Sequence, residues 1–383
     1  MPTIRSGAGI DTGSTSYGVL STVRKVDMRD KIFLLEPSAA PLTLLLSKMG
    51  KQVAKNPEFS WLEDEAMPIS DTVDGTFTTV TITDILVDNG SYFATNVTVK
   101  VPRSGEVLKV TAVATDTLTV TRGYGGTAAA AINDADDLII MGGNAAENAD
   151  AENPRAVKKA RAYNYSEIVR TPFGVSGTLD ASDTYGGNAL AYLQKARGID
   201  HAKSIELKVL WGERKESDNT SSISRATGGL WQVISSNSSD YSSTMTAALI
   251  ETASATDFRY GSNSKMLFGC RAVVGAVSAL AHSSLQVAPL DKTFGINIVK
   301  WITSNGVYNI VAHDLFVSGT YDEVAIVADL EQLVYRHLPG RDTKLRTNIQ
   351  TPGKDGRIDE YLTEFGLERR LEKYHAKWVN CVA

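Results

Sequence analysis

The stretch YGGNALAYLQKARGIDHAKSIELKVLWG, Tyr185 to Gly212, predicts one long amphipathic helix. Asn188 is suited to cap its first turn, and Gly212 to end it in a left-handed conformation. A helix of about 36 Å, at about 1.5 Å per residue, can carry a sheet on its apolar side. The opposite side is mostly basic. The apolar residues recur every three or four positions, as one side of a helix requires, and comprise Leu190, Leu193, Ala196, Ile199, Ala202, Ile205 and Val209.

The composition around this helix is that of an ordinary soluble globular protein. The chain has 383 residues, 43% of them hydrophobic and 22% charged, and a formal net charge of −5. This length allows two or three cores, and the mild acidity disfavours sequence-specific DNA binding. We find no apolar run of membrane-spanning length and no signal peptide, so a cytoplasmic protein is expected. Cys270 and Cys381 are predicted to be two buried thiols rather than a disulfide.

The region before the helix predicts an arm, a short helix and a hairpin with a guest domain. Residues 1–34 are rich in Gly, Ser and Thr and then become charged, so they form an arm that is disordered or laid across another subunit. Residues 35–55 contain a helix that begins after Pro41 and is stopped by Gly50. Residues 56–74 and 146–180 predict the two halves of a long hairpin, with the return strand near 164–175.

Residues 75–145, between the two halves, predict a small β-barrel or sandwich that can fold alone. Five alternating stretches in this region are bounded by Gly, Asp, Asn or Pro. Insertions of this kind are tolerated at exposed tips. They read FTTVTITDILV, NVTVKVP, GEVLKVTAVAT, DTLTVTRGYGG and DDLIIMGG.

The region after the helix mixes helices with strands, so the fold class is α+β. Residues 181–222 hold the long helix and a polar loop. Between 223 and 329 we expect a serine-capped helix at 242–254, a buried strand at 265–270, a helix at 271–281, and a strand at 324–330. A hairpin at 296–312 is expected to turn through left-handed Asn305 and Gly306. Residues 330–383 contain two longer strands, at 357–366 and 371–382.

No catalytic or metal-binding constellation stands out. Asp11-Thr12-Gly13-Ser14 matches the aspartic peptidase tetrad, but it has no flanking apolar strand and no second copy. Gly123-Tyr124-Gly125-Gly126 lacks the spacing of a nucleotide fingerprint and predicts a structural turn. Ser176 does not lie in a nucleophile elbow, and the five histidines show no zinc spacing. We therefore expect no enzyme activity, cofactor or metal, and a structural or binding role is favoured.

The segment GEVLKVTAVATDTLTVTRGYGGTAAAAI, residues 105–132, resembles a stretch of one family of tailed-bacteriophage major capsid proteins. Thr-Arg-Gly-Tyr-Gly-Gly-Thr is its most specific part. FSWLEDEAMPISDTVDG before it and NYSEIVRTPFGVSGTLDASDTYG after it resemble that family's extended loop. LTEFGLERRLEKYHAKWVN, residues 362–380, resembles the closing strands of the peripheral domain. The resemblance covers most of the chain from about residue 20 onward and is weakest at 215–260.

This resemblance implies the Hong Kong 97 capsid fold, with residues 1–34 as the N-terminal arm and 35–55 as a peripheral-domain helix segment. Residues 56–74 and 146–180 would form the extended loop, which carries the inserted β-domain at 75–145. The peripheral domain would comprise 181–222 and 330–383, and the axial domain 223–329. Candidates for contacts between subunits are Arg24, Arg29, Phe59, Trp61, Glu63, Asp64, Arg170 and Arg341.

The resemblance further implies hexamers and pentamers in an icosahedral shell around double-stranded DNA, bound without sequence specificity. The partners would be other copies of the chain, a portal protein, and separate scaffolding or decoration proteins. The shell would assemble in the host cytoplasm and be part of the virion, with no membrane. Two alternatives remain: an encapsulin-like nanocompartment shell, and a carbohydrate-binding or hydrolytic protein whose β-rich middle reads sugars. The second would predict clustered exposed aromatics or paired carboxylates within 75–145, where only Phe77, Tyr92, Phe93 and Tyr124 are present.

Overall fold

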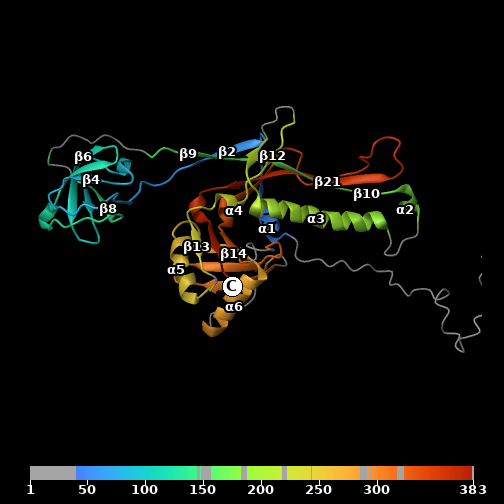
Figure 1. Ribbon diagram of the computed structural model, residues 1–383. Coiled ribbons are helices and arrows are strands. Elements are labelled where there is room, and N and C mark those ends of the chain that lie inside the picture. Colours follow the sequence, from blue (N-terminus) through green and yellow to red (C-terminus); the bar gives the residue numbers. More distant parts are fainter. Residues whose placement is uncertain are drawn as a thin grey trace, which may run out of the picture. The chain divides into compact units, whose positions relative to one another are not determined.

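The computed structural model describes residues 40–144, 147, 157–182, 188–217, 222–242, 244–284, 291–293, 296–316 and 323–381. The predicted arm, with Arg24, Arg29 and the tetrad at Asp11, lies outside these residues. The chain divides into two compact units (Figure 1). We call Trp61–Ala162 the barrel unit, and Met1–Ser60 together with Tyr163–Ala383 the host unit.

The predicted long helix is confirmed as α3 (Ala189–Trp211) in the host unit. The Asn188 side chain accepts a hydrogen bond from the backbone N–H of Ala191 at 3.0 Å, as a helix cap does. The predicted left-handed stop is wrong, because Gly212 has φ −56° and ψ 142°. A Cβ at Gly212 would lie 2.4 Å from the Lys208 carbonyl oxygen, so close backbone packing requires glycine there.

The two halves of α3 differ in burial. Ile205, Val209 and Leu210 are buried in the C-terminal half. His201 and Glu206 are buried beside them, which a pattern of apolar residues does not reveal. In the N-terminal half, every described side chain, including the predicted apolar stripe, remains exposed or only partly buried. The helix therefore uses its C-terminal half for the core of its own chain.

A five-stranded sheet lies along α3, and Figure 1 shows the helix running beside β10 and β21. Strand order is β1-β19-β21-β10, and β20 pairs with β21. Strand β10 is an edge strand with Pro172 in its middle, a position that proline tolerates because the edge needs no further N–H donor. The strands are β1 (Lys51–Val53), β10 (Glu167–Val175), β19 (Leu333–His337), β20 (Lys344–Arg346) and β21 (Arg357–Arg369).

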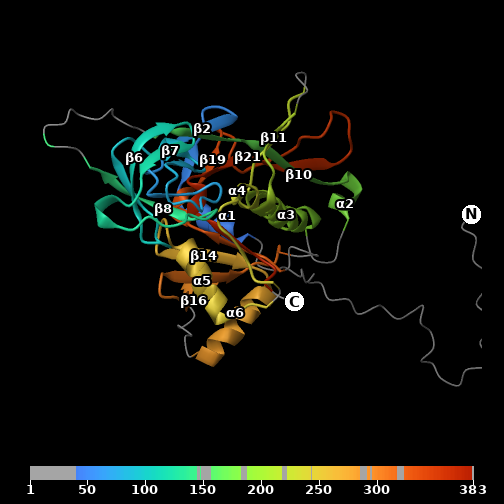
Figure 2. The same ribbon diagram turned by 60° about the vertical axis from the view of Figure 1, so that its left-hand side comes forward.

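The host unit contains a second sheet, which is mixed and has seven strands. Figure 2 shows α5 and α6 beside it. The last strand, β22, pairs with β13 and β18 in this sheet, so the region 330–383 contributes strands to both sheets. In spatial order the strands are β13 (Ser238–Asp240), β22 (Ala376–Val379), β18 (Ala325–Ala328), β14 (Ser264–Gly269), β17 (Val307–Ala312), β16 (Ile296–Ile302) and β15 (Asp291–Thr293).

Two details of this region differ from the sequence prediction. Helix α5 (Ala247–Asp257) begins five residues later than expected and is capped by Thr246, not by serine. The hairpin of β16 and β17 is confirmed, but neither Asn305 nor Gly306 is left-handed. A Cβ on Gly306 would lie 2.6 Å from the Phe258 ring, so glycine is needed there for packing. The preference of glycine for turns does not show whether it is needed for a left-handed backbone or for close packing.

The remaining elements of the host unit are short. Helix α1 begins at Pro41, as predicted from proline's preference for the first helical turn. Cys270 and Cys381 are both buried and are not joined in a disulfide, which confirms the prediction of two thiols. The other elements are α1 (Pro41–Met49), α2 (Gly177–Ala181), α4 (Leu230–Val233), α6 (Arg271–Ser284) and the paired strands β11 (Lys215–Glu216) and β12 (Arg225–Ala226).

The strand at 58–63 pairs with a different segment from the one expected. Strand β2 (Glu58–Glu63) pairs with β9 (Ala160–Tyr165) in a two-stranded sheet. The segment predicted to return beside it continues as β10 and pairs with β21 over nine residues instead. The alternating pattern located both strands but could not specify their partners, because register and pairing are set by contacts far away in sequence.

The barrel unit contains a six-stranded sheet that closes on itself. Its order is β3-β8-β5-β6-β7-β4, and an antiparallel bridge between Val73 and Val87 joins its two ends. The hydrogen bonds Asp74 N to Leu86 O and Asp88 N to Thr72 O, both 3.0 Å, flank this bridge. The strands are β3 (Ser70–Thr72), β4 (Asp84–Leu86), β5 (Val97–Lys100), β6 (Val107–Ala114), β7 (Thr117–Thr121) and β8 (Asp137–Gly143).

The barrel has a core of its own, formed by valines, leucines, isoleucines and Phe93. The predicted strand FTTVTITDILV is wrong in its first half, because only Asp84–Leu86 is a strand. Residues 77–83 form turns and one bridge, Phe77 to Ile132. Closure of the barrel leaves its end strands without an open edge.

Candidate functional site

Three buried carboxylates follow one another along β21. Glu360, Glu364 and Glu368 are 1%, 6% and 1% exposed, and their spacing of four residues places them on one face of the strand. Thr363, on the opposite face, lies 2.7 Å from His201 Nε2 of α3. The carboxylates therefore lie on the face turned away from the helix. Buried carboxylates require cationic or hydrogen-bonding partners.

Arginines from neighbouring segments supply those partners. Arg170 of β10 donates from Nε and Nη2 to Glu360 at 2.9 and 2.7 Å. Arg341 pairs with Glu364. A guanidinium has five N–H donors, and the Arg170 side chain remains 58% exposed, so spare donors remain on the surface. We call the full set the arginine row, which comprises Arg170, Arg336, Arg341, Arg346 and Arg370.

The four predicted contact residues near β2 have different environments. Phe59 is only 6% exposed, and its ring packs so closely on Gly366 that a Cβ there would lie 2.6 Å away. Little of this ring is left for another subunit. Trp61 is half-buried and donates from Nε1 to Glu63 at 2.7 Å, whereas Asp64 is exposed, 4.0 Å from Lys159. The acidic run 63–65 is thus mostly at the surface.

A buried carboxylate joins three segments of the host unit. Glu206 of α3 accepts hydrogen bonds from the backbone N–H groups of Leu42 and Thr43, at 2.8 and 2.7 Å. It thereby caps α1, whose own N-cap residue offers no side-chain bond. Glu206 also lies 2.7 Å from Nε2 of His313, just after β17. Because Leu315 N–H donates to Nδ1 of that ring, the proton lies on Nε2 and points at Glu206.

A second buried polar cluster lies in the seven-stranded sheet. The Lys265 ammonium group donates to the carbonyl oxygens of Asp257, Tyr260 and Tyr374 at 2.5, 2.9 and 2.7 Å. The Asp257 carboxylate accepts from the Tyr308 hydroxyl at 2.8 Å. Burial raises the pKa of Asp257 and lowers that of Lys265. Since all three ammonium protons are engaged, this lysine holds loops together and is not a nucleophile.

The Thr-Arg-Gly-Tyr-Gly-Gly segment forms a structural loop of the barrel. Arg122 pairs with Glu106 at 2.8 Å, and their side chains are 6% and 0% exposed. Burial alone would raise the pKa of Glu106, but hydrogen bonds from Arg122 and from the backbone of Ala130 and Gly123 outweigh it, so the pKa is lowered. Gly123 and Gly125 have positive φ, as a tight loop requires. The predicted structural turn is confirmed.

The aromatics that would have supported sugar binding serve the barrel instead. Phe93 is buried, and Phe77 and Tyr92 pack against the core. Tyr124 accepts a hydrogen bond from the Asn144 side chain at 2.7 Å. Within the described ranges, no group of three or more His, Cys, Asp or Glu residues is arranged to hold a metal. No helix in the same ranges has the length and apolar character needed to cross a membrane.

The profile of one protein family, the SU10 major capsid protein, matches residues 10–381. The chain belongs to the SU10 major capsid protein family. It is therefore a capsid shell protein of the virion. The family is one of structural proteins. The buried carboxylates of Glu106, Glu360 and Glu364 agree with this, because they pair with arginines of the same chain. A search among curated proteins finds no match.

Solved structures support the fold of this SU10-family capsid protein. The capsid of a native GTA particle is similar with a TM-score of 0.51 and 8% identity, and the match covers 94% of this chain and 96% of that one. The capsid of an empty GTA particle gives 0.50 and 8%, with the same coverage. Such likeness shows the Hong Kong 97 type of capsid fold. An encapsulin complex from Synechococcus elongatus PCC 7942 gives a TM-score of 0.44 at 9% identity, over 58% of this chain and 76% of that one.

Two sets of important residues were not found from the sequence. The glutamates of β21 and Glu206 were not among the residues singled out from the sequence. Their partners lie up to 190 residues away for Glu360 and 164 for Glu206. A glutamate placed among the apolar positions of a helix was the available signal for Glu206.

Proposed function

We propose that this capsid protein assembles into hexamers and pentamers that close an icosahedral head shell around double-stranded phage DNA. The family match over residues 10–381 carries this proposal. Capsid proteins bind one another through many modest contacts, and their sum holds the shell. The chain would enclose DNA without sequence-specific binding, in keeping with its net charge of −5. Portal protein and separate scaffolding or decoration proteins would be its partners, and assembly would occur in the host cytoplasm.

The proposed domains follow the boundaries expected from the sequence, with one change. Residues 1–34 would be the arm, and the pairing of β2 with β9 supports the extended loop at 56–74 and 146–180. The five-stranded sheet and α3 would form the peripheral domain, together with the helix segment at 35–55. The seven-stranded sheet would form the axial domain. Because β22 pairs in that sheet, we extend the axial domain beyond 223–329 to include the last strand.

The arginine row is the surface we propose for contacts between subunits. Its members neutralise buried glutamates of their own chain and still keep donors at the surface. An acidic segment with exposed carboxylates, such as residues 63–65, would complement it on a neighbouring copy. Arg170 and Arg341 would then contact Glu63 or Asp64 of another subunit. Trp61 would flank that contact, whereas Phe59 would support it from within its own chain.

The barrel unit is proposed to strengthen the shell by clamping neighbouring capsomers. Its closed sheet and separate core allow it to fold without disturbing the host unit. A chain in which a short Gly/Ser linker replaces residues 76–144 should still form shells. Those shells should dissociate at a lower temperature than wild-type shells, as measured by light scattering during heating. Equal heat resistance would exclude the clamping role.

The assembly proposal is tested by electron microscopy of the purified protein without added partners. We expect closed icosahedral shells, or rings with five- and six-fold symmetry. Native particles isolated from infected cells should contain double-stranded DNA. Shells filled with protein cargo instead would indicate a nanocompartment. A chain that stays monomeric at high concentration, even with its scaffolding protein, would contradict the proposal.

A further inference from the structure

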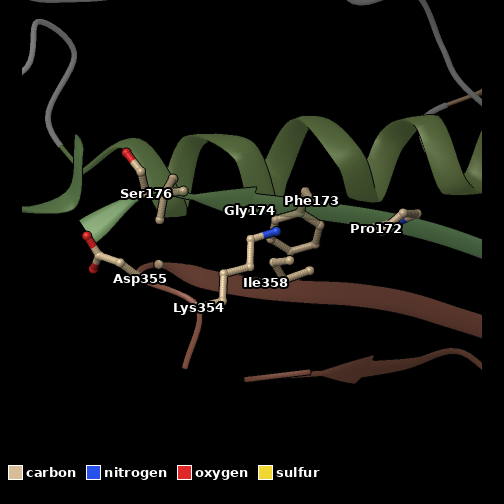
Figure 3. Close-up of a pocket in the computed structure, with 9 residues that line it drawn as sticks. Pro172, Phe173, Gly174, Ser176, Lys354, Asp355 and Ile358 are labelled. Carbon is tan, nitrogen blue, oxygen red and sulfur yellow. The ribbon is translucent and has the colours of Figure 1, made fainter. Parts of the chain in front are cut away.

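The tip of the β10 and β21 ribbon carries a shallow groove with charged residues at its rim. The end of β10 supplies Pro172 and Phe173, and the start of β21 supplies Ile358. Lys354 and Asp355 extend from the loop that precedes β21, as Figure 3 shows. Ser176, whose side chain is uncharged, lines one end of the groove. The groove is therefore an apolar trough between two strands with one cation and one anion beside it.

Backbone packing at two glycines fixes the shape of this tip. A Cβ at Gly174 would lie 2.7 Å from the Arg357 carbonyl oxygen, and Gly356 has φ +134°. Larger residues would force the strands apart at both positions. A Cβ at Gly177 would lie 2.3 Å from Oδ1 of Asp355, so this carboxylate rests directly on the backbone at the start of α2. The anion therefore lies beside the groove, against the start of α2.

The charges at the tip differ from those on the rest of β21. Asp359, Glu360, Glu364 and Glu368 each pair with an arginine of the same chain. Lys354 and Asp355 are both exposed, and neither side chain has an ion pair or hydrogen bond among the residues that the structure describes. Their charged groups also do not pair with each other. A cation and an anion at separate points of the groove rim are therefore available to another molecule.

We propose that this groove, here called the tip groove, is a contact between two copies of the chain in which Lys354 of each copy pairs with Asp355 of the other. The proposal rests on the proposed function, since a shell supplies the second copy. A patch with adjacent opposite charges is complementary to itself, so one twofold arrangement satisfies both charges and covers both apolar troughs. A partner of a single charge sign would leave one of the two charges unpaired.

The contact would join capsomers rather than build them. One pair of small patches is too weak to hold two chains together alone, but it is repeated at each copy of the shell. Loss of the contact should therefore leave rings intact and lower the yield of closed shells. This places the effect at a stage of assembly that can be observed separately from folding and from ring formation.

Charge exchange tests the proposal. The single reversals K354D and D355K place like charges opposite each other, and each should lower the fraction of protein in shells about tenfold while rings accumulate. The double variant K354D/D355K restores opposite charges and should recover the wild-type fraction. Sedimentation measures the shell fraction, and negative-stain images show the rings. K344D makes the same charge change on β20 and should assemble normally.

A second variant moves the anion without changing any charge. In G177A the new Cβ displaces the Asp355 carboxylate, which lies at the end of a flexible side chain, so the fold should persist and shell yield should fall. Singles that assemble like the wild type would overturn the proposal, and so would a double variant no better than the worse single. If the wild-type chain forms no rings or shells under any condition, the proposed function fails instead.

Discussion

The host unit reaches much farther along the sequence for partners of some of its buried charges than the barrel unit does. In the barrel, Arg122 and Glu106 are 16 residues apart, and Arg103 and Asp136 are 33 apart. In the host unit, Glu206 holds a helix start 164 residues away, and Arg170 reaches a glutamate 190 residues away. The barrel pairs can form as soon as the barrel closes, whereas these two host contacts need most of the chain to be in place.

The two units differ in the same way in what they leave open. The barrel sheet closes through Val73 and Val87. The host unit keeps β10 as an edge strand, the N-terminal half of α3 only partly buried, and the arginine row at its surface. A closed unit is complete by itself, while open edges and spare donors suit a surface that other copies cover. This difference predicts separate responses to mutation and pH.

The largest effect is expected from Glu206→Gln. The amide cannot accept all the hydrogen bonds that the buried carboxylate accepts, so the host unit should lose about 3–5 kcal/mol of unfolding free energy. The stability of the barrel should not change. Hydrogen exchange measured by mass spectrometry distinguishes the two units, because each peptide reports its own region. Glu213→Gln, on the exposed loop after α3, is the control and should be neutral.

Arg122→Ala should destabilise the barrel unit and leave the host unit unchanged. It leaves Glu106 fully buried without its cation, which should cost the barrel about 3 kcal/mol. Peptides from 61–162 should then exchange faster, while peptides of α3 and β21 stay protected. Equal loss of protection in both units would show that they unfold together, and the comparison drawn above would not hold.

Acid should weaken the host unit before the barrel. Burial, together with the charge of Lys265, lowers the pKa of His375 to about 4 from the ordinary 6.5. The unfolded chain therefore binds a proton more readily, and stability falls as pH drops below 6.5. The loss is complete near pH 4 and amounts to about 3 kcal/mol, at about 1.4 kcal/mol per pH unit. His201, whose pKa burial also lowers, adds in the same direction.

The barrel should respond to acid only at lower pH. All five histidines lie outside residues 61–162. The pKa of Asp136 is lowered by its hydrogen bond with Arg103, and that of Glu106 is lowered as well. Their stabilisation is present above the ordinary carboxylate range and is lost as pH falls below it. Urea titrations from pH 7 to pH 3 should show the host transition move first, and His375→Gln should flatten its pH dependence between 6.5 and 4.

The sequence predicted local structure well where local rules decide it. The cap at Asn188, the start of α1 at Pro41 and the alternating strands of the barrel all follow from residue preferences within a few positions. The glycines were located but partly misread. Gly212 and Gly306 are required by contacts with Lys208 and Phe258, not by left-handed backbone. The need for glycine where another residue packs closely cannot be recognised from the sequence, because the packing residue is not known.

The candidate site was predicted only in part, because its partners are distant in sequence. Arg170 and Arg341 were named for their charge, and the structure adds the buried glutamates behind them. The exchange of strand partners at β2 has the same origin, since alternation does not reveal which strand lies beside which. Glu206 lies among the apolar positions of its helix, but that pattern does not reveal its partners, which lie up to 164 residues away.

The smallest effect on stability is expected from two matched arginines, and it separates assembly from folding most sharply. Arg170 is 58% exposed beside Glu360, and Arg103 is 46% exposed beside Asp136. Neither arginine-to-alanine change should lower the unfolding free energy much, because solvent screens half-exposed ion pairs. Arg170→Ala should nevertheless lower shell formation strongly, since it removes donors proposed to meet a neighbouring subunit, while Arg103→Ala should assemble normally. Sedimentation gives the shell fraction and urea titration the stability. Parallel losses in both variants would mean that Arg170 acts only within its own chain.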